Sequence, residues 1–351
     1  MGSAPLNIAL IGTGMVAMTH LLAIRDARPA LRLAAICARR RESAEAFAAK
    51  AEAELGYRPT IYADAQAIAD DAEIDAAIIV TPPNARAELI APLAQAGKAI
   101  LLEKPVARTG AEAEAVVALC EAADATLGIV FQHRMRAASL KATELVASGT
   151  LGPLGLVEIA VPWWRDQAYY DEPGRGTYER DGGGVLISQA IHTIDLALSL
   201  TGPVAEVQAM TATTRFHQME AEDFASAGLR FENGAAGSLV ASTASFPGAA
   251  ETITLHFERA SLHLGEGVLT VSWRDGRVER FGATASTGGG ADPMAFTHEW
   301  HQSILEDFAD ALRQSRAPLV TGRQALESHR LIDAITLSAH EGRIVTLGEH
   351  V

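Results

Sequence analysis

The first 130 residues alternate short apolar runs with Ala-rich stretches, and this alternation limits the possible fold more than any other feature of the chain. Each apolar run is followed by a turn of small residues and then by a stretch of helical character. Apolar strands that alternate with helices predict a parallel sheet covered on both faces, the doubly wound α/β Rossmann architecture. The expected strands are residues 6–12, 31–37, 60–62, 74–80, 99–103 and 126–131, and the expected helices are residues 15–28, 42–54, 84–96 and 110–124.

Beyond about residue 130 the pattern changes to short runs in which apolar and polar residues alternate. Gly, Asn-Gly and Asp-Gly turns separate these runs, which predicts an antiparallel meander in a large open sheet. The runs are residues 155–164, 204–216, 223–231, 234–246, 251–258, 261–265, 267–273 and 277–282, and a Gly-rich stretch (286–293) and two helices (294–315 and 322–341) follow. We therefore expect a dinucleotide-binding domain over residues 1–128 and an α+β substrate domain over residues 129–351.

Composition excludes several classes of function. The chain has 351 residues, 48% of them hydrophobic and 21% charged, and no apolar run approaches the roughly 18 residues that span a bilayer. A net charge of −14 repels a phosphate backbone, so nucleic acid is not expected as a partner. Cys37 and Cys120 form no CxxC pair, and the N-terminus lacks the basic region of a signal peptide. We expect a cytoplasmic protein with neither a disulfide framework nor a membrane span.

A glycine-rich turn follows the first expected strand. Gly12, Gly14 and Ala17 have the G-x-G-x-x-A spacing exactly where that strand should pass into the first helix. The glycines allow a tight turn and a close approach of the backbone, so that a pyrophosphate can lie on the N–H groups of the helix N-terminus. The sequence therefore predicts a dinucleotide site that includes these residues and Met15 between them.

The end of the second strand bears on the choice between NAD and NADP. An acidic residue there binds the ribose 2′-hydroxyl of NAD, whereas arginine accommodates the 2′-phosphate of NADP. The chain has Arg39 and Arg40 at this place, and no acidic residue stands between the end of the strand and Glu42. The pattern favours NADP, although NAD remains open because some NAD enzymes also lack the acid.

Chemistry-bearing side chains occur at two further places. Glu103, Lys104 and Pro105 stand at the carboxyl end of the fifth strand, where open α/β sheets bind ligands, and a lysine there can hold a hydroxyl and handle its proton. Ser188, His192 and Asp195 recur at four- and three-residue spacing in an apolar segment expected to be helical. We expect this polar stripe to face a substrate crevice.

An ordered set of motifs resembles the Gfo/Idh/MocA oxidoreductase family over nearly the whole chain. The motifs are "GTGMVA", "TPPNARAELI", "EKPVA", "ASGTLGPLG" and "DGGGVLISQAIHTIDLALSLTG". The resemblance implies an N-terminal Rossmann domain, a C-terminal α/β domain with an open sheet that also serves oligomerisation, and a homodimer or homotetramer. It also implies NAD(P)-dependent oxidation or reduction of a sugar, cyclitol or related polyol carbon.

Residue by residue, the resemblance assigns the catalytic lysine to Lys104 and the substrate histidine to His192. The position four before that histidine is Asp in many members and is Ser188 here, so proton transfer falls more heavily on Lys104, His192 or water. The usual histidine after "TPxx" is absent, because Arg86 and Ala87 occupy its neighbourhood, and we predict no role there. We further expect Thr81, Pro82, Glu103 and Lys104 among the cofactor contacts, and Asp195 among the substrate contacts.

Residues 163–184 form a long segment rich in aromatic and cationic side chains. It is similar to a loop of UDP-N-acetyl-aminosugar-uronate dehydrogenases within the family, which implies sugar-nucleotide chemistry. Such loops build binding sites, and arginine forks suit a carboxylate or phosphate, so we expect Trp164, Tyr170 and Arg175 to contact the substrate. Alternatively, the tryptophans pack at a domain interface and do not contact the substrate.

No metal site is expected. Residues 216–223 form a turn without a second ligand group at helical spacing, and His298 with His301 does not make an HExxH motif. Two other functions remain open. One is a regulator that binds sugar and cofactor without turnover, and the other is an NAD-dependent glycosidase, a minority activity of this family.

Overall fold

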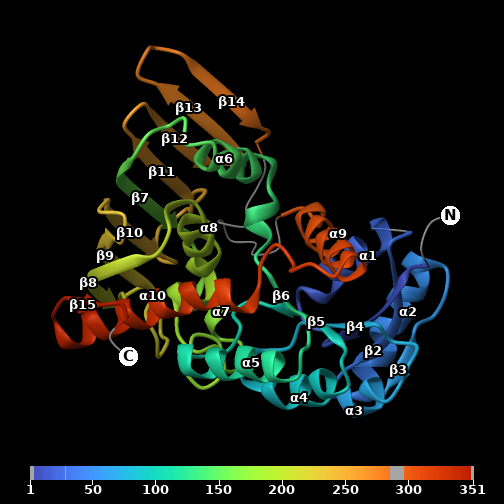
Figure 1. Cartoon of the computed structure of the whole chain (residues 1–351). Coiled ribbons are helices and arrows are strands. Elements are labelled where there is room, and N and C mark those ends of the chain that lie inside the picture. The colour runs from blue at the N-terminus through green and yellow to red at the C-terminus, as the bar shows by residue number, and fades with distance from the viewer. Residues whose placement is uncertain (1–3, 28, 285–295, 349–351) are drawn as a thin grey trace. The chain divides into compact units, whose positions relative to one another are not determined.

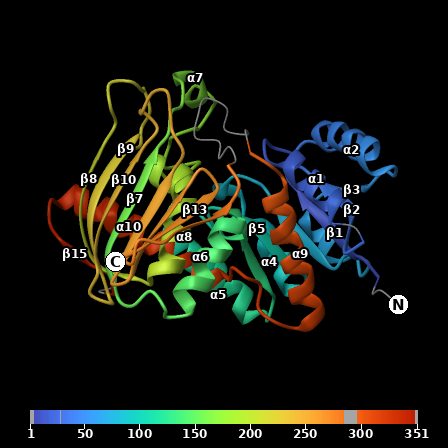
Figure 2. The same ribbon diagram turned by 90° about the horizontal axis from the view of Figure 1, so that it is seen from above.

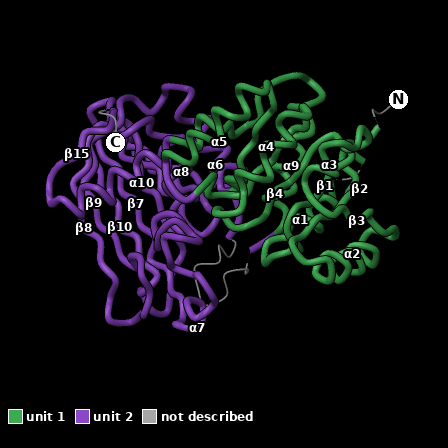
Figure 3. Tube along the Cα trace, turned by 90° about the horizontal axis from the view of Figure 1, so that it is seen from below, with its two compact units in different colours: residues 1–107, 111–132, 298–326 green, residues 108–110, 133–297, 327–351 purple. Residues whose placement is uncertain are grey.

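The computed structural model describes residues 4–27, 29–284 and 296–348, and the Gly-rich stretch at 286–293 lies outside these ranges. The chain forms two compact units, coloured separately in Figure 3. Unit 1 contains residues 1–107, 111–132 and 298–326, and unit 2 contains residues 108–110, 133–297 and 327–351.

Unit 1 is built on a six-stranded parallel sheet in the order β3-β2-β1-β4-β5-β6 (Figure 1). Its strands are β1 (Leu6–Ile11), β2 (Leu31–Cys37), β3 (Thr60–Tyr62), β4 (Ala76–Ile79), β5 (Ala99–Glu103) and β6 (Leu127–Val130). Every residue of β4, β5 and β6 is buried, as a sheet covered on both faces requires. The predicted doubly wound sheet is confirmed.

Helices cover both faces of this sheet. In Figure 1, α1 and α9 lie on one face, and α3, α4 and α5 lie on the other. The helices of unit 1 are α1 (Ala17–Asp26), α2 (Arg41–Leu55), α3 (Ala65–Ala69), α4 (Ala87–Gln95), α5 (Gly110–Ala122) and α9 (Glu299–Gln314), with a 3₁₀ turn η1 (Pro83–Ala85) before α4. The sequence analysis did not predict α3, whose start is marked by Asp64, because its carboxylate accepts a hydrogen bond from Ala67 N.

The chain leaves unit 1 after residue 132 and returns to it at residues 298–326, whereas the predicted second domain runs unbroken from residue 129 to residue 351. Backbone pairing explains the return. Ile129 N in β6 donates to Val320 O over 3.0 Å, and Gly128 forms an antiparallel bridge with Thr321. A segment distant in sequence therefore extends the edge of the parallel sheet.

Unit 2 contains a nine-stranded sheet in the order β14-β13-β12-β11-β7-β10-β9-β8-β15. The strands are β7 (Leu154–Pro162), β8 (Val204–Ala212), β9 (Phe224–Phe231), β10 (Ala236–Ser242), β11 (Thr252–Phe257), β12 (Ala260–Gly265), β13 (Val268–Trp273), β14 (Val278–Gly282) and β15 (Val345–Thr346). Only the β7–β10 pair is parallel. The predicted large, mostly antiparallel sheet is confirmed.

Figure 2 shows α6 (Ala137–Ala147) and α8 (Ile191–Thr201) along one face of this sheet. The other helical elements are a 3₁₀ turn η2 (Gln132–Met135), α7 (Gln167–Tyr170) and α10 (Gly322–Glu341), which begins in unit 1. On the other face, register places Ala160, Val240, Ser226 and Met210 in one row across β7, β10, β9 and β8. Val240 is 44% exposed and Met210 is 60% exposed.

Residues Leu186–Ala190, just before α8, form a π-helical turn and not the regular α-helix that the spacing predicted. A π turn closes its hydrogen bonds between residues five apart, whereas an α-helix closes them between residues four apart. The regular α-helix expected before Ile191 is therefore corrected, and the orientation expected for Ser188 and His192 stays a prediction. Among the described helices, none has the length and apolar character that crossing a membrane requires.

Candidate functional site

The glycine turn after β1 has the geometry that a dinucleotide site needs. Gly12 has φ +108°, and a Cβ built on it would lie 3.0 Å from Val80 Cγ2 and 3.1 Å from the Val80 carbonyl carbon. Both the backbone conformation and the neighbouring strand therefore demand glycine. A Cβ on Gly14, by contrast, would meet no atom within 4 Å, so the space beside Gly14 is open.

The first turn of α1 fits an anion. Val16, at its N-cap, makes no side-chain cap hydrogen bond, and the first turn contains no acidic residue. Thr81, which follows β4, has a buried Oγ1 with no hydrogen-bond partner among the described residues. Free backbone N–H groups, an open glycine and an unpaired hydroxyl together suit a dinucleotide pyrophosphate. Ala17 is buried, and Met15 is 44% exposed.

Arg39 and Arg40 follow the end of β2 after one intervening residue, and both are exposed. Within the described part of the chain neither guanidinium has a carboxylate partner. The next arginine, Arg41, lies 3.5 Å from Glu45 on α2. Two cations at the end of β2 are therefore available to an anionic ligand.

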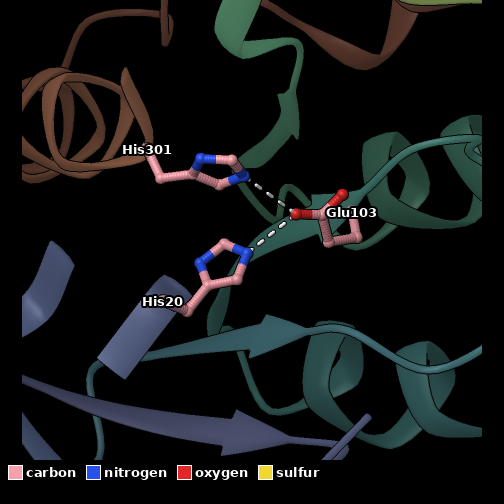
Figure 4. A group of neighbouring side chains, drawn as sticks. All are labelled: His20, Glu103 and His301. Carbon is pink, nitrogen blue, oxygen red and sulfur yellow. Dashed lines mark hydrogen bonds and ion pairs between the residues drawn. The ribbon is translucent and has the colours of Figure 1, made fainter. Parts of the chain in front are cut away.

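Glu103 ends β5 and is held by two histidines from different helices (Figure 4). His20 Nε2 of α1 lies 2.8 Å from Glu103 Oε1, and His301 Nε2 of α9 lies 3.6 Å from the same oxygen. Glu103 Oε2 accepts a hydrogen bond from the backbone N–H of Lys104 over 3.1 Å. Burial raises the pKa of Glu103, but the two histidines outweigh burial and hold it well below its ordinary value.

Arg86 lies on the opposite side of the same turn and is only 3% exposed. Its guanidinium donates to Thr81 O over 2.9 Å and 2.8 Å, to Lys104 O over 3.4 Å, and also to the carbonyls of Glu103 and Pro105. Burial lowers the pKa of Arg86 to about 10, and Glu103 opposes this change. Arg86 therefore remains a cation at neutral pH.

His192 of α8, in unit 2, is 6% exposed. Its ring stacks on that of His133 with centroids 4.7 Å apart and an interplanar angle of 23°. His133 Nδ1 in turn lies 3.9 Å from Glu251 Oε1, and Glu251 pairs with Arg136 over 2.6 Å. His192 thus adjoins a buried polar cluster contributed by η2 and by the residues that immediately precede α6 and β11.

Asp195, the third member of the predicted stripe, is paired inside unit 2. Its two carboxylate oxygens accept hydrogen bonds of 2.7 Å from Nε and Nη2 of Arg134. The aspartate side chain is 0% exposed, and that of Arg134 is 13% exposed. Ser188 is half-buried in the π turn and donates its backbone N–H to Gly184 O.

The three substrate contacts predicted in residues 163–184 have different environments in the structure. Tyr170 is 7% exposed and its hydroxyl bonds Thr243 Oγ1 over 2.6 Å, as in a packed structural tyrosine. Arg175 Nε lies 3.2 Å from Glu172 Oε2, and its guanidinium covers the ring of Tyr169. Trp164 is half-buried and packs against Phe216 and Phe246. The polar groups of all three have partners inside unit 2, because Trp164 Nε1 also donates to Asp166 Oδ1 over 3.1 Å.

Close packing also fixes the glycine run that precedes the π turn. A Cβ on Gly184 would lie 1.7 Å from Glu222 O, so no other residue fits there. Glu222 is the reason, because its carboxylate accepts from Gly184 N over 3.1 Å and from Leu186 N over 3.0 Å. Glu222 therefore caps the start of the π turn.

Several of these residues were not predicted from the sequence, among them Arg86, His20, Arg134 and His301. One signal was present for Arg86, because it stands where the resemblance expects a histidine. The histidines carried no comparable signal, since His20 and His301 approach Glu103 from helices at opposite ends of the chain.

Comparison with known proteins agrees with this geometry. Residues 6–131 match the model described as "Oxidoreductase family, NAD-binding Rossmann fold", and residues 139–263 match the "GFO/IDH/MocA C-terminal domain". The chain belongs to the GFO/IDH/MocA oxidoreductase family. As in that family generally, an NAD-binding Rossmann unit is combined with a second unit that contains an open sheet.

Individual members of the GFO/IDH/MocA family resemble the chain over different lengths. A D-apiose dehydrogenase of Paraburkholderia graminis is 28% identical over 97% of this chain and 89% of its own length. An inositol 2-dehydrogenase of Rhizobium meliloti is 30% identical over 59% of this chain and 58% of its own length. The structure of the WlbA dehydrogenase of Bordetella pertussis, in complex with NADH and UDP-GlcNAcA, has a TM-score of 0.83, 27% identity and full coverage of both chains.

Proposed function

We propose that this oxidoreductase oxidises a hydroxyl-bearing carbon of a carbohydrate or cyclitol with NAD(P)⁺ and that Lys104 acts on the reacting hydroxyl. One observation carries the proposal: the backbone of Lys104 is held from both sides at the carboxyl end of β5, within the NAD-binding sheet. Ligands of open α/β sheets bind at that edge. The names of the relatives, which act on apiose and inositol or bind a sugar nucleotide, support the class of substrate.

The chain's own residues have separate tasks in this mechanism. The uncapped N-terminus of α1 and the open space at Gly14 bind the pyrophosphate. The bound nicotinamide supplies the chemistry of a hydride acceptor. Lys104 donates a hydrogen bond to the substrate hydroxyl and, in its neutral form, takes the proton that leaves the oxygen as the carbon loses its hydride.

Four finer proposals accompany this function. Arg39 and Arg40 favour NADP over NAD, and His192 is proposed as a substrate-binding residue in the role that the family resemblance assigns. We also propose a homo-oligomer that associates through the face of the nine-stranded sheet that carries Val240 and Met210. The two cysteines are buried free thiols, which suits the proposed cytoplasmic location.

The first experiment identifies the ligands. Thermal denaturation is measured with NAD and NADP and then, with cofactor present, with polyols, sugar acids and sugar nucleotides, because a ligand at about 100 times its Kd adds roughly 2.7 kcal/mol of stability. Compounds that stabilise the protein are tested for turnover at the absorbance of the reduced cofactor. Binding without any turnover supports a regulator, and release of an aglycone without net change in the cofactor supports a glycosidase.

The second experiment replaces Lys104 by Met, with Lys50→Met as the matched control on the exposed surface of α2. We expect Lys104→Met to lower kcat by about 100-fold or more, the range for loss of a general acid or base. Lys50→Met should leave kcat unchanged. A folded Lys104→Met protein that keeps turnover within a few-fold of the wild type contradicts the proposed mechanism.

A further inference from the structure

Two buried groups hold the backbone of the turn that bears Lys104. On one side, the Arg86 guanidinium donates to the carbonyls of Glu103, Lys104 and Pro105 while it is anchored to Thr81 O. On the other side, the Glu103 carboxylate accepts from Lys104 N. The carbonyl and the N–H of the same residue are therefore both bonded to buried ionised side chains.

Burying the Arg86 cation costs free energy unless hydrogen bonds and a nearby opposite charge compensate it. Arg86 is 3% exposed, and its hydrogen bonds to described residues all go to peptide carbonyls, with Glu103 as a nearby charge of opposite sign. Removing a cation from water into such surroundings requires excellent geometry and full use of its donors. Three of the hydrogen bonds of Arg86 go to the backbone carbonyls of Glu103, Lys104 and Pro105.

The two histidines complete the arrangement by fixing Glu103. His20 is 0% exposed and His301 is 1% exposed, and both Nε2 atoms are directed to the same carboxylate oxygen (Figure 4). His20 Nε2 is within hydrogen-bond distance of Glu103 Oε1 and His301 Nε2 lies beside the same oxygen, which leaves the other oxygen of the carboxylate for Lys104 N. The histidines therefore act on Lys104 through Glu103.

These three side chains could also be considered as metal ligands. Their ligand atoms lie within 4.8 Å of one another. However, the 2.8 Å between His20 Nε2 and Glu103 Oε1 is a hydrogen-bond length, and a cation there would adjoin the buried Arg86 charge. The geometry favours donor histidines over metal-binding ones.

We propose that Arg86, together with His20 and His301 acting through Glu103, positions Lys104 for its reaction with the substrate hydroxyl. This inference rests on the proposed role of Lys104. Arg86, His20 and His301 are positioning residues, because each acts on the backbone or the neighbour of Lys104. They form a support for the lysine within unit 1.

The test uses variants that separate charge, donor and volume. Arg86→Lys keeps the charge and removes the planar fork, and Arg86→Met removes both. His301→Gln keeps a side-chain N–H donor, whereas His301→Leu does not. The matched controls are Arg323→Lys and Arg323→Met, at an exposed arginine that pairs with Glu121, and His298→Gln, three residues before His301.

The first readout needs no substrate. The chain has four lysines (Lys50, Lys98, Lys104 and Lys141), so reductive ¹³C-methylation gives four lysine signals in an NMR spectrum, and Lys104→Arg assigns the signal of Lys104. We expect the Lys104 signal to move toward that of exposed Lys50 in Arg86→Met and His301→Leu. It should remain nearly in place in His301→Gln and in the controls.

The second readout is the division between kcat and KM, measured with NAD(P)⁺ and the polyol or sugar found by the ligand screen. Misplacement by about 1 Å costs on the order of 100-fold in rate, so kcat should fall by about 10- to 100-fold in Arg86→Lys and His301→Leu while KM changes little. His301→Gln should restore most of the lost kcat.

The outcomes distinguish this inference from the proposed function. An unmoved Lys104 signal in folded Arg86→Met and His301→Leu overturns the positioning role, whatever Lys104 does. Activity that survives Lys104→Met overturns the proposed function, whereas the NMR result stands on its own. Stoichiometric Zn²⁺ in the purified protein, with activity lost on chelation and restored by Zn²⁺, would replace positioning by a metal role. If Arg86→Met fails to fold, the comparison of His301→Leu with His301→Gln decides.

Discussion

Asp195 of α8 and Arg134 of η2, 61 residues apart in sequence, form a bidentate ion pair inside unit 2. Removing one partner of a buried pair costs about 3–5 kcal/mol, because the other charge remains without compensation. We expect Asp195→Asn to lower the free energy of unfolding by an amount in this range, measured by urea titration. The double variant Asp195→Leu with Arg134→Met should recover most of the loss. Unchanged stability with a raised KM would instead support the substrate contact predicted for Asp195.

Gly12 and Gly14 should respond differently to alanine. Gly12→Ala places a Cβ against Val80 at a φ that L residues rarely adopt, so the protein should lose stability. Gly14→Ala meets no atom of the protein and should leave the melting temperature unchanged. If a pyrophosphate lies against Gly14, however, the new methyl group must weaken NAD(P)H binding. Fluorescence titration with reduced cofactor measures this, and undiminished affinity would exclude the close approach at Gly14.

The preference for NADP depends on Arg39 and Arg40. A charge-assisted hydrogen bond contributes about 1.5–3 kcal/mol, so replacing both arginines by Ala should weaken NADPH binding by about tenfold or more. NADH binding should change by less than about twofold, because NADH lacks the 2′-phosphate. Arg41→Ala, which removes the neighbouring exposed arginine, is the control. Equal losses for both cofactors would assign these arginines no part in the choice between them.

His301 should make stability depend on pH between 7 and 5. Burial lowers the pKa of His301 below its ordinary 6.5, although Glu103 opposes this change. As the pH falls through 6.5, the unfolded chain therefore binds a proton that the folded chain does not, and stability decreases by at most about 1.4 kcal/mol per pH unit from this group. The pKa of Glu103 in the unfolded chain is near 4.5, so its contribution is lost only at lower pH. Urea midpoints at pH 7.5 and 5.5 should differ less in His301→Gln than in the wild type.

Self-association through the open face of the nine-stranded sheet can be tested by adding charge to it. Val240 and Met210 are exposed in a row of uncharged residues that crosses four strands. Val240→Glu should convert the proposed oligomer to monomers, as measured by size-exclusion chromatography with light scattering. Leu140→Glu, at an exposed apolar position on α6, is the control and should leave the mass unchanged. A wild-type protein that is already monomeric would contradict the proposal.

Local patterns in the sequence were sufficient for most helices and for the described strands other than β15. The apolar runs of unit 1 and the alternating runs of unit 2 fall on observed strands, because burial on two faces or on one imposes those patterns directly. The short helix α3 was not predicted, although Asp64 before it is a residue type preferred at helix N-caps. The π turn at Leu186–Ala190 could not be foreseen, because an analysis by helical periodicity assumes regular α geometry.

The support around the candidate site was harder to predict, since it depends on contacts between distant segments. Lys104 was identified from its place at the end of a strand, whereas Arg86 reaches that turn from a different loop. The partner of Asp195 is Arg134 in η2, and no pattern in the neighbouring sequence indicates that this arginine forms an ion pair. Hydrogen bonds of this kind are determined by the tertiary fold, and the hydrophobic periodicity of the sequence does not predict them.

The position of β7 limits the order in which the nine-stranded sheet can assemble. Strands β8 to β10 and strands β11 to β14 each follow one another closely and can pair as local hairpins. The strand β7 comes before all of them, yet Leu156 pairs with Ala236 on one side and Ala160 pairs with Thr252 on the other. Closing such long loops is slow compared with hairpin formation. The joining of the two meanders by β7 therefore has a larger entropic barrier than the pairing of neighbouring strands within either meander.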